Sequence, residues 1–153
     1  CRLGSGIAPI RAMRDAGVKV GLGVDGSASN DAGNLIGEAR QMMLLQRVAL
    51  GADAMGAREA LEVATLGGAR ALGRDDCGSL EVGKRADVAV WDISGIEAAG
   101  AWDPVAALVF CGPQRVRHLF VVGRQVVRDG QVTTVDRGRV IEDQTRLARA
   151  LMG

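Results

Sequence analysis

Residues 21–31 read GLGVDGSASND, and this stretch is the most informative part of the sequence. It continues a β-branched and glycine-rich run, VKVGLGV at residues 18–24, which is typical of a short buried strand. A helical stretch at residues 8–16 precedes the run and ends at Gly17, a residue that commonly terminates helices. A helix followed by a strand is typical of α/β proteins. Asp25 then lies at the carboxyl end of the predicted strand, where α/β barrels hold their catalytic groups.

The sequence that follows predicts two helices and then a β-rich module. Residues 35–50 and 57–72 have apolar residues at helical spacing, and Gly67-Gly68 in the second helix predicts close packing against a neighbour. From residue 78 the sequence alternates and breaks at turns, with Asp129-Gly130 as a hairpin signal. Residues 139–152 return to helical spacing. The shared apolar face predicted for the first of these helices consists of Ile36, Ala39, Met43, Leu44 and Val48.

Composition excludes several classes of protein. With 48% hydrophobic and 24% charged residues, the chain is typical of a globular protein. A net charge of +1 with interspersed signs, two Phe and two Trp argue against a nucleic-acid polymer as partner. The apolar runs are shorter than the roughly 20 residues that span a bilayer, so we expect no membrane partner and a cytoplasmic location. Three cysteines without a CxxC spacing indicate ordinary reduced thiols.

Asp25 is the candidate catalytic residue. A carboxylate at this place can bind a divalent metal ion and also accept a proton from water whose pKa the metal lowers. An Asp-Gly pair is also common in turns, where the side chain caps the backbone. The local pattern leaves both interpretations open.

An ordered series of motifs resembles the amidohydrolase superfamily, in the branch of cytosine, guanine, 8-oxoguanine and triazine aminohydrolases. The motifs are LGSGIAPI at residues 3–10, GVDGSASND at 23–31, ATLGGARALG at 64–73 and GSLEVGKRADVAVWD at 78–92. The resemblance implies an α/β fold: the C-terminal part of a metal-dependent (β/α)8 TIM-type barrel followed by part of a small β-sandwich. We therefore expect barrel elements in residues 1–75, a sandwich segment in 76–137 and a C-terminal helix in 138–153.

The resemblance also implies roles for individual residues. Asp25 matches the aspartate that ends the eighth barrel strand, binds the metal and shuttles the proton. One divalent metal ion, expected to be zinc, would be the cofactor of the intact protein. The loop from Arg2 to Ile7 resembles a loop close to the substrate, and Cys1 would line the same wall. The residues expected to contact substrate are Gly4, Ser5, Gly6 and Ser27, while Ser5 has a second interpretation as a helix N-cap.

The histidines that the family uses for its metal do not occur in the sequence. The resemblance implies an HxH pair and two single histidines, whereas the sequence has only His118, in an alternating strand-like segment. We expect His118 to be an ordinary residue of that strand. The chain starts at Cys1 without a methionine. We therefore expect it to be a piece of a longer protein, and metal to be absent from the piece alone.

The leading functional hypothesis is hydrolytic deamination of a purine-like heterocycle, 8-oxoguanine above all, with release of ammonia. One alternative is a triazine-type chlorohydrolase or aminohydrolase. An alternative of another class is a catalytically inert fragment. The expected partners are a small heterocyclic substrate and either a second copy of the chain or the missing N-terminal part of the same protein.

Overall fold

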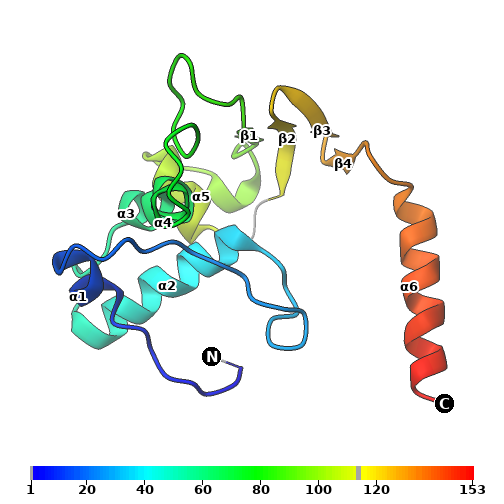
Figure 1. Cartoon of the computed structure of the whole chain (residues 1–153), viewed down its shortest axis with the longest axis horizontal. Helices are drawn as coiled ribbons and strands as arrows, with labels where there is room; N and C mark the ends of the chain where they lie inside the picture. The colour runs from blue at the N-terminus through cyan, green and yellow to red at the C-terminus, as the bar shows by residue number, and fades with distance from the viewer. Residues whose placement is uncertain (1, 113–114) are drawn as a thin grey trace.

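The computed structural model describes residues 2–112 and 115–153, which form a group of packed helices, a small sheet and a separate C-terminal helix (Figure 1). The helices are α1 Ile10–Asp15, α2 Leu35–Leu50, α3 Ala57–Glu62, the π turn η1 Val63–Gly67, α4 Gly68–Ala71, the 3-10 turn η2 Ile96–Ala98, α5 Pro104–Phe110 and α6 Arg137–Leu151. The strands are β1 Val88–Trp91, β2 Val116–Val121, β3 Arg124–Arg128 and β4 Gln131–Val132. Across the described residues, every helix is too short or too polar to cross a bilayer.

Helix α2 confirms the predicted helix at residues 35–50. Asn34 caps it by accepting a hydrogen bond from the Gly37 backbone N–H at 3.2 Å. The predicted apolar face is correct for Ala39 and Met43 but wrong for Val48, which is 82% exposed. Val48 follows Met43 by five residues, which places it about 140° further around a helix of 3.6 residues per turn.

The hydrophobic core lies where α2, α3 and α5 meet. Met43, Met55 and Val109 are fully buried there, and they come from α2, the loop before α3, and α5. Val20 and Leu22 pack against this core from residues 18–24. The segment that leads to Asp25 therefore rests on the core rather than on a sheet.

The predicted helix at residues 57–72 is confirmed as one helical segment, with a π turn in its middle that the sequence did not predict. Gly67, the last residue of that turn, and Gly68, the next residue, allow residues 18–24 to approach closely. A Cβ on Gly67 would lie 2.4 Å from the Val20 carbonyl oxygen, and a Cβ on Gly21 would lie 2.8 Å from the Gly68 Cα. The predicted close packing at Gly67-Gly68 is confirmed.

Residues 18–24 do not form the strand that the sequence predicted. No segment within residues 2–112 and 115–153 pairs with them in a ladder, and a strand requires a hydrogen-bonded neighbour. Their burial nevertheless alternates: Val20, Leu22 and Val24 are half-buried, whereas Gly21 and Gly23 are exposed. Residues 18–24 thus share with a strand the alternation of half-buried and exposed residues with a period of two, but lack a hydrogen-bonded neighbour among the described residues.

The β-rich module is a four-stranded antiparallel sheet in the order β1-β2-β3-β4. The hairpin predicted at Asp129-Gly130 is confirmed, with φ of 48° and 73° at these two residues. A second hairpin turns at Val122-Gly123. The chain between β1 and β2 leaves the sheet to form α5, which packs on α2 and α3. The expected sandwich segment, residues 76–137, thus also contributes to the helical core.

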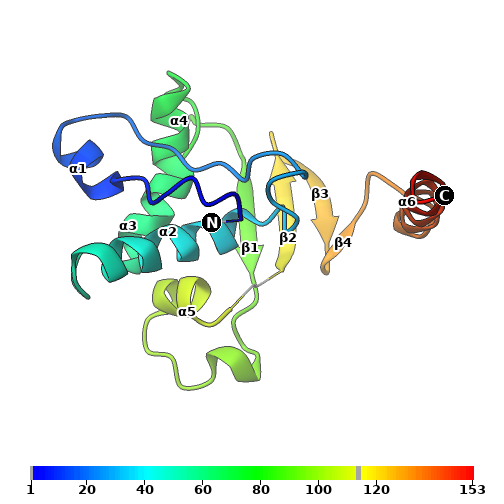
Figure 2. The ribbon, with the colours of Figure 1, turned by 90° about the horizontal axis from the view of Figure 1, so that it is seen from below.

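Helix α6 confirms the predicted C-terminal helix and stands apart from the rest of the molecule beyond β4 (Figures 1 and 2). Asp136 caps its first turn by accepting from the Arg139 backbone N–H at 3.1 Å. None of its residues is buried. We call its exposed apolar residues the α6 apolar face: Val140, Ile141, Leu147 and Leu151.

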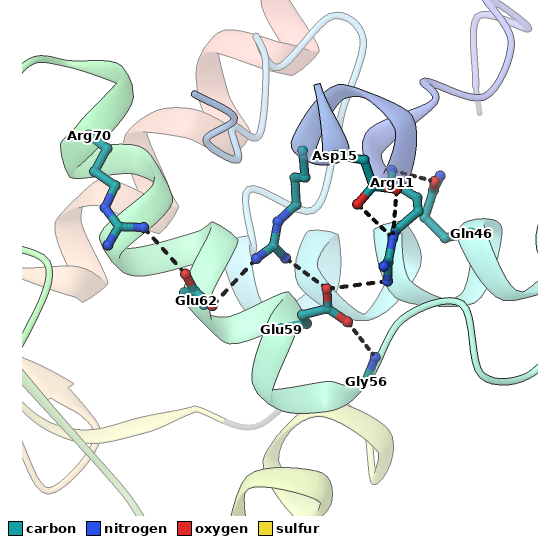
Figure 3. A network of polar contacts seen from close by, with 8 residues as sticks. Arg11, Asp15, Gln46, Gly56, Glu59, Glu62 and Arg70 are labelled. Carbon is teal, nitrogen blue, oxygen red and sulfur yellow. Dashed lines mark hydrogen bonds and ion pairs between the residues drawn. The ribbon is translucent and has the colours of Figure 1, made fainter. Parts of the chain in front are cut away.

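A polar network fixes α1 on the helices beneath it (Figure 3). Buried Gln46 accepts from the Arg11 backbone N–H at 3.1 Å and donates to the Ala8 carbonyl at 2.9 Å. Glu59 accepts from Arg14 at 3.2 Å, which ties α1 to α3. The network thereby places the loop before α1 and the residues 18–24 that follow it.

Candidate active site

Asp25 lies where residues 18–24 end and the chain turns. Its φ is 64°, in the left-handed region that asparagine and aspartate tolerate better than most residues. Such conformations are found preferentially at active sites and ligand clamps. The extended residues before Asp25 and the turn after it bring its carboxylate to the surface of a pocket.

Both oxygens of the Asp25 carboxylate accept a hydrogen bond from the turn that follows. The Ser29 hydroxyl donates to Oδ2 at 2.7 Å, and the Gly26 backbone N–H donates to Oδ1 at 2.7 Å. The Ser29 hydroxyl, and then the Gly26 N–H, hold the pKa of Asp25 below its ordinary value. Asp25 is therefore ionised at neutral pH and available as a metal ligand or proton acceptor.

The pocket has a volume of about 400 Å³, which lies in the range of small-molecule sites. Two loops form it together with α2: the loop before α1, and the turn after Asp25. Its lining residues are Arg2, Leu3, Ser5, Gly23, Val24, Asp25, Ser29, Asn30, Asp31, Ala32, Glu38 and Gln41.

Of the predicted substrate-contacting residues, the structure brings Ser5 to the pocket together with Asp25. Gly4 and Gly6 have φ of 64° and 102°, and a Cβ on either would meet nothing within 4 Å. They and the exposed Ser27 lie outside the lining of the pocket. Cys1, expected on the same wall, lies outside the described residues.

The sequence analysis missed the part of the wall that α2 provides. Glu38 and Gln41 lie three residues apart on one side of this helix and both line the pocket. The Asn30 side chain donates to Glu38 Oε1 at 2.6 Å, which attaches the turn to α2. Their i,i+3 spacing, which places two residues on one side of a helix, was the signal available in the sequence.

Arg2 forms an ion pair with Asp31, and both residues line the pocket. The two residues belong to the two loops that line it: Arg2 begins the loop that resembles a substrate loop, and Asp31 ends the motif at residues 23–31. Because both side chains are exposed, the pair contributes little to stability. Its structural effect is to join the two loops.

Residues 2–112 and 115–153 hold no group of three or more His, Cys, Asp and Glu side chains arranged to bind a metal. Asp25 suits a divalent metal because it is an ionised carboxylate at a pocket. His118 lies on β2, where its Nδ1 is 3.3 Å from both the Gln125 Nε2 and the Asp129 backbone N. The described residues thus bring together fewer than the three protein ligands of a metal centre, which requires further ligands.

Comparison with known proteins identifies the family of the chain. The sequence model described as the amidohydrolase family matches residues 1–130. The chain belongs to this family. The expected fold class is confirmed, since the mixed helices and sheet match solved amidohydrolases as one part of a larger α/β fold.

The relatives of this amidohydrolase chain include deaminases of purine-like compounds. An 8-oxoguanine deaminase of Pseudomonas aeruginosa is 44% identical over 151 residues, covering 99% of the chain and 34% of that protein. A 5-methylthioadenosine/S-adenosylhomocysteine deaminase of Desulforudis audaxviator is 45% identical, covering 99% of the chain and 36% of that protein. The chain spans about a third of the length of these relatives.

Among solved structures, an atrazine chlorohydrolase of Arthrobacter aurescens in complex with zinc has a TM-score of 0.87 and 39% identity. The match covers 95% of the chain and 33% of that structure. A divalent metal therefore occurs in a close structural neighbour of the chain.

Proposed function

We propose that the chain is the C-terminal third of a metal-dependent amidohydrolase that deaminates a purine-like heterocycle, with 8-oxoguanine as the leading substrate. The observation that carries the proposal is the ionised Asp25 carboxylate, which faces a pocket of about 400 Å³ in a chain of this family. The 44% identity to an 8-oxoguanine deaminase supports this substrate.

Asp25 acts first as a proton acceptor. A divalent metal ion, when bound, would lower the pKa of the attacking water. Asp25 takes the proton as the water oxygen forms its bond to the ring carbon. It then returns the proton to the leaving amino group, and the carbon–nitrogen bond breaks to release ammonia. Asp25 would also be one of the ligands of the metal, and the remaining ligands would come from the rest of the protein.

The test is an Asp25→Asn variant of the complete protein. We expect ammonia release from 8-oxoguanine to fall by about 10²- to 10⁴-fold, because general acid–base catalysis contributes this much. Asp75→Asn is the matched control, since Asp75 is exposed and outside the pocket. Full activity in Asp25→Asn would contradict the mechanism.

Two other substrates have support from individual relatives. The 45% identity to a 5-methylthioadenosine/S-adenosylhomocysteine deaminase favours an adenosine derivative, and the chlorohydrolase neighbour favours a triazine. A panel of 8-oxoguanine, 5-methylthioadenosine and atrazine, each assayed alone, separates the three: ammonia release is measured for each of the first two and chloride release for the third. We expect the highest kcat/KM with 8-oxoguanine.

We also propose that the 153-residue chain alone is inactive, because its described residues do not bring together three or more side chains that could hold a metal ion in place. Elemental analysis of the purified chain tests this. Stoichiometric zinc that survives gel filtration would contradict it. The proposed partners are a small heterocycle, together with either a second copy of the chain or the remaining part of the protein.

A further inference from the structure

We propose that Ser29 is a positioning residue that orients the Asp25 carboxylate for the reaction. This inference rests on the proposed function. The Ser29 hydroxyl lies 2.7 Å from Asp25 Oδ2 and 3.2 Å from the Gly26 carbonyl oxygen. A hydroxyl has one hydrogen to donate, and the shorter contact with an ionised acceptor is the stronger one.

Two donors hold the Asp25 carboxylate, one at each of its two oxygens. The Gly26 backbone N–H occupies one lone pair of Oδ1, and the Ser29 hydroxyl occupies one lone pair of Oδ2. A carboxylate held at only one oxygen can rotate about its bond to Cβ, and the second hydrogen bond stops this rotation. Each oxygen keeps a lone pair for a metal ion or a water molecule in the pocket.

The turn that carries Ser29 is closed without its hydroxyl. The backbone N–H groups of Ser29 and Asn30 both donate to the Gly26 carbonyl, at 3.0 and 2.9 Å. The Asn30 side chain attaches the end of the turn to Glu38 on α2. Removing the hydroxyl should therefore leave the loop in place and release only the carboxylate, which separates positioning from a structural role.

Ser29→Ala in the complete protein is the first test. We expect kcat to fall by about 10- to 100-fold with KM unchanged, as is typical when a hydrogen bond that orients a metal ligand is lost. We expect the zinc affinity, measured by competition with a chromophoric chelator, to fall by about 10- to 100-fold as well. The second readout does not depend on turnover.

Ser29→Thr and Ser29→Val form a matched pair that differs by a hydroxyl against a methyl group. The proposal predicts that Thr keeps kcat and zinc affinity near the wild-type values and that Val loses both. Ser94→Ala is the remote control, because Ser94 donates to Asp92 at 2.6 Å in the same kind of serine–aspartate pair far from the pocket lining. We expect this variant to match the wild type.

Equal kcat and zinc affinity in the Thr and Val variants would overturn the proposal, and so would wild-type values in Ser29→Ala. The comparison with Asp25→Asn separates the two levels of inference. If Asp25→Asn is inactive while Ser29→Ala is unchanged, only the role of Ser29 fails. If Asp25→Asn keeps full activity, the proposed function itself fails.

Discussion

Within the part of the chain that the structure describes, three residues other than glycine have a left-handed backbone conformation: Asp25, Val122 and Asp129. Aspartate accepts this conformation at modest cost, and Asp129 uses it in the hairpin between β3 and β4. Asp25 uses it at the pocket, where it turns the chain immediately after the extended residues. Val122 is different, because a β-branched side chain is strained at its φ of 50°.

Val122→Asn should stabilise the protein by about 1 kcal/mol, since asparagine adopts the left-handed conformation more easily than valine. Val122 is 60% exposed, so little apolar burial is lost. Urea unfolding followed by circular dichroism measures the change. Val135→Asn is the control, because Val135 is 55% exposed and has no left-handed backbone. A destabilised Val122→Asn variant would show that the valine is held by packing that outweighs its strain.

Asp76 should make the stability sensitive to acid. The guanidinium groups of Arg74 and Arg85 donate to its carboxylate and hold its pKa well below the ordinary value of 3.8. Because the folded pKa lies below the unfolded one, this stabilisation is fully present above about pH 4 and is lost as the pH falls further. Asp76→Asn should therefore lose less thermal stability than the wild type between about pH 6 and pH 3. Asp75→Asn should behave as the wild type, and identical acid sensitivity of all three proteins would refute the role of Asp76.

Among the elements, the contact of residues 18–24 with Gly67 and Gly68, at the end of the π turn and the start of α4, sets the position of Asp25. Gly67→Ala should be destabilised by about 1–3 kcal/mol or more, because its Cβ would lie 2.4 Å from the Val20 carbonyl oxygen. Gly68→Ala is the matched control: its Cβ would meet nothing within 4 Å, and its φ is −60°. We expect the free energy of unfolding of Gly68→Ala to rise by about 0.5–1 kcal/mol, because alanine has the higher helix propensity. Chemical denaturation measures the free energy of unfolding of both variants. Equal changes in Gly67→Ala and Gly68→Ala would refute the close contact at Gly67.

The elements that the sequence predicted well are those determined by local pattern. Apolar spacing was sufficient for α2, and Asp129-Gly130 was sufficient for its hairpin. The turn at Val122-Gly123 was missed because valine is unfavourable there. The burial of Gln46 was missed as well, since it depends on backbone partners in α1 and in the loop before it, which lie 35 and 38 residues away along the chain.

The candidate site was predictable only in part. Asp25 could be found because a motif marks it, and Ser5 because its loop resembles a substrate loop. Glu38 and Gln41 reach the pocket through the packing of α2 against the turn after Asp25, which no local pattern encodes. The same holds for the ion pair of Arg2 with Asp31, whose residues are 29 positions apart.

At the scale of the whole molecule, two surfaces favour association. Residues 18–24 have no ladder partner within the described ranges, and an unpaired extended edge attracts another chain. The α6 apolar face is exposed along the helix. We expect the 153-residue chain alone to self-associate at concentrations of about 10 μM and above, where such surfaces promote aggregation.

Sedimentation velocity over a concentration series tests this expectation. Replacing Ile141 and Leu147 by lysine should reduce the association, because charge interrupts the α6 apolar face. Arg146→Lys, which keeps the charge, should leave it unchanged. A chain that sediments as a monomer at every concentration would refute the expectation.

Because α6 is isolated, its backbone amides should exchange with solvent sooner than those of the core. Isolated helices shorter than about 12–15 residues are marginal in water, and α6, with 15 residues and none buried, lies at this limit. In dilute solution its amides should exchange through local unwinding, whereas those of Met42 and Met43 in α2 should exchange only when the core opens. Hydrogen–deuterium exchange should therefore label α6 before the core of α2, and equal protection of the two helices would mean that α6 is covered. Amide exchange in α6 thus measures a local helix–coil equilibrium, whereas amide exchange in α2 measures the stability of the whole fold.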